Sequence, residues 1–294
     1  MFAAFDQWLG HQGAAASRYF RLPKAKALPA LNAWFNYGQS TVQTWKASRS
    51  WHIETNFLHQ LVSAASSQTT DPRDRVYALL SHPSSRRAST YDPDMRTDYR
   101  AVCRERPPLI TPDYTKTTEE VYYDTACALL KQHKDFHPLG AIFHDKETLN
   151  SDLPTWVPRW DRIGSKSTIG CALTDPWNCS KGGPAFYLQV MPGRELRVML
   201  WKWATRRNRV LLLCTGRKAF RSKERNDQCI GPELTSTGDW IVFIFGSWVP
   251  HVLRHVGSDR YRHLGTCYVS GIMYGEGMEI FEQDGRRTEM VYLV

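Results

Sequence analysis

The histidines and cysteines of the C-terminal half are the side chains that could bind a metal ion. His251 lies four residues before His255, and His263 lies four residues before Cys267, with Cys229 further upstream. This part of the chain has the composition of β-strands, on which residues four apart share a face but are separated by about 13 Å. Zinc requires ligands about 2 Å from the ion in a closed tetrahedron. We therefore expect no metal site and interpret these histidines as ordinary surface residues.

Motifs for a catalytic nucleophile or a bound phosphate are absent from the sequence. No Gly-x-Ser-x-Gly elbow occurs, and the chain has neither a Walker A run nor a Gly-x-Gly-x-x-Gly run. The short glycine clusters are explained by turns. The residues therefore predict no catalytic centre and no cofactor, although an enzyme of unknown class stays open as an alternative.

Five charged residues stand where they could fix the backbone or contact a ligand: Arg73, Asp74, Asp239, Arg254 and Glu276. Asp74 falls in the first turn of an expected helix, where a negative charge interacts favourably with the helix dipole. Asp239, Arg254 and Glu276 flank apolar strands, and we expect Arg254 to form a structural ion pair with Asp239 or Glu276. The alternative is that these residues form a surface for a ligand or a peptide.

The composition is that of a soluble globular protein with a basic surface. Of 294 residues, 42% are hydrophobic and 23% are charged, and the formal net charge is +9. The basic residues are dispersed and do not interleave with aromatic side chains, which disfavours a nucleic-acid groove but leaves a basic nucleic-acid-binding protein as an alternative. The seven cysteines include no Cys-x-x-Cys pair, and no apolar run approaches the roughly 18 residues of a membrane helix. We therefore expect a cytoplasmic protein without a membrane span.

Helix signals dominate residues 1–135, which we interpret as a helical region. Residues 53–66 carry apolar side chains at the spacing of an amphipathic helix. A further helix is predicted to begin at Asp71, which suits the N-cap, with Pro72 in the first helical position. This helix should end near residue 82.

A second well-marked helix is predicted over residues 117–132. Thr117 and Glu120 make a capping box, in which each side chain bonds the backbone N–H of the other residue. Residues 84–108, between the helices, are polar and contain prolines, which is typical of a loop or insertion. Residues 136–180 then form a Trp/Pro-rich connector, whose tryptophans we expect to pin it to the core.

From about residue 186 the sequence pattern is typical of β-strands, and we interpret residues 181–294 as a C-terminal β-rich region. Short apolar runs separated by glycines predict strands at residues 186–190, 195–203, 210–214, 240–245, 250–256 and 261–270. The run 240–245 is apolar on both faces and should be a central strand. The expected fold class is α+β, a helical N-terminal half packed on a small, mostly antiparallel C-terminal β-sheet or partial barrel.

Four groups of residues, in order along the chain, resemble the fungal heterokaryon incompatibility (HET) family. The residues that carry the resemblance are 70–80; 112–116 with 119–122; 153–158 with Trp160; and 216–217, 220, 230–232, 238–239, 249–250, 253–254, 268–269, 271–273 and 275–276. The Ser-Tyr-x-Trp-Gly type motif that marks the HET domain proper is missing. The chain therefore resembles the region C-terminal to that domain.

The resemblance implies a part of a HET-type incompatibility protein, acting in fungal non-self recognition and programmed cell death. In that role this region would regulate or recognise through contacts with a protein partner, and it would not be an enzyme. The five charged residues named above all lie in the matching segments. A truncated, non-functional paralogue is the remaining alternative.

Overall fold

The computed structural model describes residues 57–86, 107–133, 135–162, 177–181, 187–214, 217–285 and 287–294. The described residues all belong to one compact unit, residues 52–294. The first 56 residues of the predicted helical region lie outside the described residues, as do positions 87–106 of the predicted loop and 163–176 of the predicted connector.

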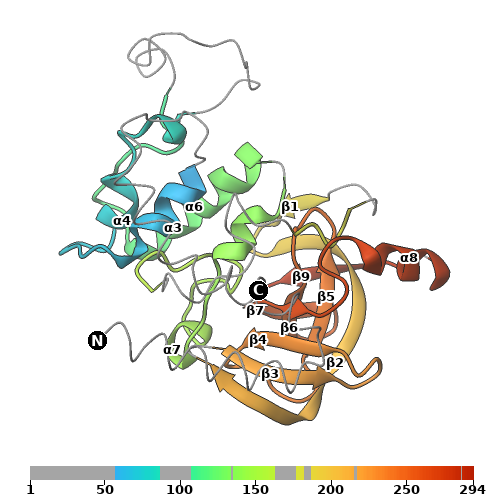
Figure 1. The fold of residues 1–294 in the computed structure, drawn as a ribbon. Coiled ribbons are helices and arrows are strands. Elements are labelled where there is room, and N and C mark those ends of the chain that lie inside the picture. Colours follow the sequence, from blue (N-terminus) through green and yellow to red (C-terminus); the bar gives the residue numbers. More distant parts are fainter. Residues whose placement is uncertain are drawn as a thin grey trace, which may run out of the picture. The chain divides into compact units, whose positions relative to one another are not determined.

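Five strands form a closed barrel. They are β2 (Leu196–Cys214), β5 (Trp240–Ile244), β6 (His251–Gly257), β7 (Arg260–Thr266) and β9 (Glu289–Leu293). The strands follow one another in the order β5–β6–β7–β9–β2, and β2 also pairs with β5, which closes the ring. All pairs are antiparallel except β7 with β9, which run parallel. In Figure 1 the long β2 ribbon curves along the other barrel strands.

Strand β2 extends beyond the barrel and carries the remaining strands. It pairs with β1 (Leu188–Val190) and with β3 (Arg217–Ser222), and the sheet continues through β4 (Gln228–Pro232) to β8 (Tyr268–Val269). Register shifts opposite both β5 and β3 let this 19-residue strand bend. One strand therefore belongs both to the barrel and to its extension.

The helices of the described residues are short. They are α3 (Phe57–Ser63), α4 (Asp74–Tyr77), α6 (Thr118–His133), α7 (Lys146–Leu149) and α8 (Glu276–Gln283), together with the 3-10 helices η1 (Ala64–Ser66), η2 (Pro83–Ser85) and η3 (His137–Ala141). Only α6 is longer than eight residues. None of these helices has the length and the apolar character needed to cross a bilayer.

The predicted fold class, α+β with a helical N-terminal half, is wrong. The described residues are mostly β and form a closed five-stranded barrel with further strands, accompanied by five short α-helices. The helix predicted from Asp71 to about residue 82 is a single turn, α4. Its capping residues form a tight turn instead, because the Asp71 carboxylate accepts the Arg73 N–H at 2.9 Å and the Asp71 carbonyl accepts the Asp74 N–H at 3.1 Å.

The sequence predicts two strands, 195–203 and 210–214, where the structure has the single strand β2. The polar residues between the two runs have the character of a turn, yet the strand continues through them. Thr205 donates its N–H and its hydroxyl to the Glu224 carboxylate, both at 2.7 Å, and the Arg206 N–H donates to the Asp239 carbonyl at 2.9 Å. Polar groups from later in the chain therefore satisfy the polar middle of the strand.

Two predictions about the segments before the barrel are confirmed. Helix α6 begins with the expected capping box, since the Thr117 N–H donates to Glu120 Oε2 at 2.8 Å and the Glu120 N–H donates to Thr117 Oγ1 at 3.2 Å. The tryptophans of the predicted connector are buried in the core, with Trp156 0% and Trp160 1% exposed. These elements carry the side chains of the candidate site described below.

Strand β5 is central, as predicted, and is buried on both faces. Phe243 and Phe245 belong to one apolar cluster, together with Trp201 of β2 and Phe281 of α8. The side chains that alternate with them belong to a second cluster, which also contains the apolar residues of α3 and α6. The barrel and the helices therefore share a core.

Candidate functional site

The first two HET-like segments meet at Tyr114. The Arg73 guanidinium donates from Nη1 to the main-chain oxygens of Tyr114 (2.6 Å) and Lys116 (3.0 Å), and it lies 5.2 Å from the centre of the Tyr114 ring. The Tyr114 hydroxyl donates to Asp74 Oδ1 at 2.6 Å. The neighbours Arg73 and Asp74 thus fix both ends of one tyrosine, and we call these three residues the Tyr114 cluster.

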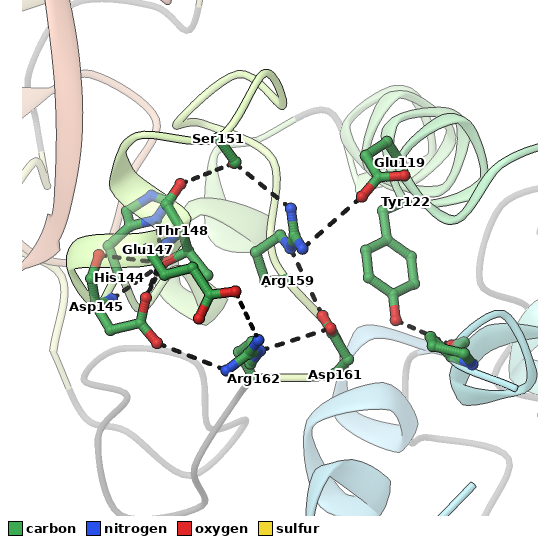
Figure 2. A network of polar contacts seen from close by, with 11 residues as sticks. Glu119, Tyr122, His144, Asp145, Glu147, Thr148, Ser151, Arg159, Asp161 and Arg162 are labelled. Atoms are coloured by element: carbon green, nitrogen blue, oxygen red, sulfur yellow. Dashed lines mark hydrogen bonds and ion pairs between the residues drawn. The ribbon is translucent and has the colours of Figure 1, made fainter. Parts of the chain in front are cut away.

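Two buried tyrosines also connect the first and second HET-like segments. The hydroxyl of Tyr77 donates to the main-chain oxygen of Asp113, and that of Tyr122 donates to the main-chain oxygen of Pro72, both at 2.9 Å. Tyr77 is 7% and Tyr122 0% exposed, and burial raises the pKa of Tyr122. Figure 2 shows Tyr122 reaching from its helix to this contact. The two hydroxyls therefore link the segments in opposite directions along the chain.

Hydrogen bonds shift the pKa values of two groups in and beside the Tyr114 cluster. The bonds that Arg73 donates lower the pKa of Asp71, and the two side chains form an ion pair at 2.7 Å. The hydrogen bond to Asp74 raises the pKa of Tyr114. Neither Asp74 nor Asp113 forms an ion pair within the described residues. The Asp74 carboxylate, which accepts the Tyr114 hydroxyl, and the Asp113 carboxylate, which accepts the Thr115 N–H and hydroxyl, therefore have no basic side chain as a partner among the described residues.

Tyr114 keeps 56% of its surface exposed despite these bonds. A side chain that is already fixed loses little conformational entropy on binding, and tyrosine and arginine are enriched among the residues that dominate binding energy at interfaces. The carboxylate and hydroxyl groups of the cluster are bonded to one another, with no activated nucleophile between them. The arrangement suits recognition better than catalysis.

Residues that adjoin the third HET-like segment form an ion-pair network. Arg159 lies 3.9 Å from Glu119 of α6 and 3.6 Å from Asp161. Arg162 lies 3.8 Å from Asp161 and 3.2 Å from Glu147 of α7. Figure 2 shows the resulting line of alternating charges between α6 and α7. Because Glu119 belongs to the second segment, Arg159 connects that segment with the part of the chain that adjoins the third.

Arg254 of β6 pairs with Asp239, one of the two partners expected for it. Its Nε and Nη2 donate to the two oxygens of the Asp239 carboxylate at 2.9 and 2.8 Å, and Nη2 also donates to the main-chain oxygen of Leu234 at 2.8 Å. Asp239 is 4% exposed, and its Oδ2 accepts the N–H of Ser236 at 2.6 Å. This bidentate pair connects the turn before β5 with β6.

Glu276 does not take part in that ion pair. It lies at the start of α8, where its carboxylate accepts the N–H of Tyr274 at 2.8 Å. The five charged residues predicted from the sequence therefore fall into two groups of two and one single residue.

A buried chain of Ser247, His251 and His263 is the main feature that the sequence analysis missed. His251 Nδ1 lies 2.8 Å from His263 Nε2, and His251 Nε2 lies 2.6 Å from Ser247 Oγ. Both histidines are 0% exposed, so their interpretation as surface residues is wrong. They are buried because they lie on the paired strands β6 and β7 of the barrel. The one available signal is that His251 stands within an apolar run, residues 249–253.

The same chain has the order of a catalytic triad, in which a histidine activates a serine and a third group orients the histidine. Ser247 is only 2% exposed, however, and the two rings are fully covered, so a substrate cannot reach the hydroxyl. Burial lowers the pKa of His251 to about 3 and that of His263 well below its usual value, which keeps both rings neutral. The chain is therefore a polar part of the core. Among the residues with described positions, no three His, Cys, Asp or Glu side chains are grouped to hold a metal ion.

Comparison with models of protein families, with curated proteins and with solved structures gives no match to this chain. The resemblance to the HET family therefore rests on the sequence segments alone. The structure adds that the first two of those segments meet at the Tyr114 cluster, and that Arg159, which adjoins the third segment, lies next to Glu119 of the second.

Proposed function

We propose that this chain is a regulatory, protein-binding region of a HET-type incompatibility protein. It acts in the cytoplasm, in fungal non-self recognition and programmed cell death, without catalysis of its own. The observation that carries the proposal is the exposed and fixed ring of Tyr114 where two HET-like segments meet. A side chain held in an exposed position adds little to the core, so recognition explains it better than packing does.

The charges beside Tyr114 favour a basic partner. The Asp74 carboxylate accepts the Tyr114 hydroxyl, Asp113 precedes Tyr114 in the chain, and neither carboxylate has an ion pair within the described residues. A lysine or arginine of the partner can pair with either carboxylate, and an arginine can also stack on the tyrosine ring. We therefore propose that the partner presents a basic protein segment to this surface.

The fate of fused fungal cells tests the proposal. Strains of a filamentous fungal host that carry the chain, or an empty vector, are fused with a tester strain, and cell death is scored by uptake of a vital dye. Tyr114→Ala removes the exposed ring, and Tyr274→Ala is the matched control, because Tyr274 is also 56% exposed but is not one of the HET-like residues. We expect the chain to change the frequency of death, Tyr114→Ala to abolish the change, and Tyr274→Ala to retain it.

Two results would overturn the proposal: equal death with and without the chain, or equal death for the two variants when both melt at the wild-type temperature. A lower melting temperature confined to Tyr114→Ala is resolved with Tyr114→Phe. That variant keeps the ring but loses the hydrogen bond to Asp74. Recognition by the ring requires Tyr114→Phe to retain the effect on cell death, and its failure to do so counts against the proposal.

A further inference from the structure

A pocket of about 270 Å³ opens beside the third HET-like segment. Leu149, Leu153 and Pro154 form its apolar part, and Arg194 and Arg262 lie on its wall. Pockets for small molecules typically begin at about 300 Å³ and combine an apolar lining with a few polar groups. At about 270 Å³ this pocket lies just below that range, so its volume and its mixed lining limit it to one very small organic molecule. It is separate from the residues that carry the proposed function.

Arg194 is held in this wall by an unusual backbone conformation. Its φ is +67°, in the left-handed region that residues other than glycine rarely adopt. The indole N–H of Trp156, which is 0% exposed, donates to the Arg194 main-chain oxygen at 2.8 Å. The guanidinium of Arg194 lies 5.0 Å from the centre of the Tyr123 ring. Strained residues that the surrounding structure holds in place are concentrated at functional sites.

Both arginines of the pocket lack an ion pair within the described part of the chain. Arg262 Nη1 donates to the amide oxygen of Asn150 at 3.3 Å, which is a neutral partner. Glu195, next to Arg194, is bonded instead to Arg260 at 2.7 Å. The two guanidinium groups can therefore still bind an anion, and their fork of donors matches the oxygens of a carboxylate.

We propose that this pocket binds a small organic monocarboxylate with a short apolar chain. The carboxylate lies against Arg194 and Arg262, and the apolar chain packs on Leu153 and Pro154. Asp152 also lines the pocket, and its negative charge opposes a dianion such as phosphate more strongly than a monoanion. A single negative charge with an apolar tail is the ligand that fits all of these groups.

Titration of the full chain with 3-methylbutanoate, followed by calorimetry and by the amide resonance of Gly193, tests the proposal. The neutral 3-methylbutanamide has the same shape without the charge, and inorganic phosphate has charge without the apolar tail. We expect the carboxylate to bind at least about tenfold more tightly than either control compound. Absence of binding at about 10 mM, or equal binding of the amide, would overturn the proposal.

Two variants with one control separate binding from stability. Arg262→Gln and Arg194→Gly should each weaken binding of 3-methylbutanoate by about tenfold or more, whereas Arg287→Gln changes an exposed arginine elsewhere and should bind like the wild type. Arg194→Gly should also raise the melting temperature, because glycine adopts a positive φ without strain. A higher melting temperature with unchanged binding in Arg194→Gly, together with unchanged binding in Arg262→Gln, would contradict the assignment.

Discussion

Arg254 is the residue whose removal tests the ion pair that the sequence predicts. Without Arg254, a carboxylate that is 4% exposed loses its bidentate partner. An unpaired buried charge is strongly unfavourable, although solvent reaches part of this site. We expect Arg254→Ala to lower the free energy of unfolding by about 2 kcal/mol, measured by urea unfolding with tryptophan fluorescence.

Arg260→Ala is the matched control for that measurement. Arg260 also binds a carboxylate, Glu195, at 2.7 Å, but its side chain is 52% exposed. Exposed ion pairs contribute little to stability because solvent screens them, so this variant should unfold close to the wild-type midpoint. Equal midpoints for Arg254→Ala and Arg260→Ala would show that the Asp239 pair does not stabilise the fold.

The buried histidines should make the protein sensitive to acid. Burial lowers the pKa of His251 to about 3, so below the unfolded value of about 6.5 the unfolded chain binds a proton that the folded chain does not. The free energy of unfolding then has its full value above about pH 6.5. As the pH is lowered below that value, it decreases by about 1.4 kcal/mol per pH unit for each such histidine. His263 acts in the same direction. Asp135, whose pKa burial raises to about 6, acts in the opposite direction below that pH.

Urea unfolding between about pH 7 and pH 5 measures this dependence. In His251→Gln the titrating group is replaced by an amide that can still bond Ser247 and His263. The slope of the free energy of unfolding against pH should then fall by about one proton. An unchanged slope would mean that the acid sensitivity comes from other groups.

Individual residues differ in how far the sequence determines their partners. Charges that flank apolar strands are conspicuous in a sequence, so Asp239 could be named as one of two partners for Arg254. The contact between His251 and His263 depends on the pairing of β6 with β7. Strand polarity alone does not reveal which neighbour covers a histidine, and that is why these two were expected at the surface.

At the scale of elements, Gly277 decides how closely α8 packs on the barrel. A Cβ built at this position would lie 2.8 Å from Cζ of Phe243, which is 0% exposed in β5. Alanine favours the helix more than glycine does. In Gly277→Ala, the gain in helix propensity therefore opposes the steric cost of the added methyl group. We expect packing to dominate and the free energy of unfolding to fall by about 1–3 kcal/mol, as measured by urea unfolding.

Phe243→Leu supplies the control, because a smaller side chain leaves room for the added methyl group. Phe243→Leu alone should be destabilising, but the double variant should be more stable than the sum of the two single effects predicts. Additive effects, or a higher unfolding midpoint in Gly277→Ala alone, would show that α8 does not rely on this close approach.

Elements with local signals were the predictable ones. The capping box of α6 lies within residues 117–120 and is visible in the sequence. Strand β2, in contrast, crosses a polar stretch because Glu224 and the Asp239 carbonyl bond it from later in the chain. No window of neighbouring residues contains that information.

At the scale of the whole molecule, closure of the barrel depends on contacts between distant residues. Arg260 of β7 lies beside Tyr292 of β9 in a parallel pair. Leu200 of β2 lies between Ile244 of β5 and Glu289 of β9. The same strands with the same polarity could form an open sheet, which is why the sequence predicted a small sheet or partial barrel with a helical half instead of a closed ring.

Strand β9 is the element on which this closure depends, because it is the neighbour of both β7 and β2. A chain that ends at residue 286 would lack Val291 and Leu293, which are 1% and 0% exposed, and it would leave two strand edges open. Open edges promote association between chains. We expect this shortened chain to lose its cooperative unfolding transition and to elute as aggregates in gel filtration.

Tyr292→Ser is the control for the shortened chain, because it keeps the backbone of β9 and changes only one partly buried side chain. It should unfold cooperatively and elute like the wild type. If the shortened chain also unfolded cooperatively at the wild-type midpoint, ring closure would contribute nothing to stability. The fold would then rest on the direct pairing of β2 with β5 and on the aromatic cluster around Phe243.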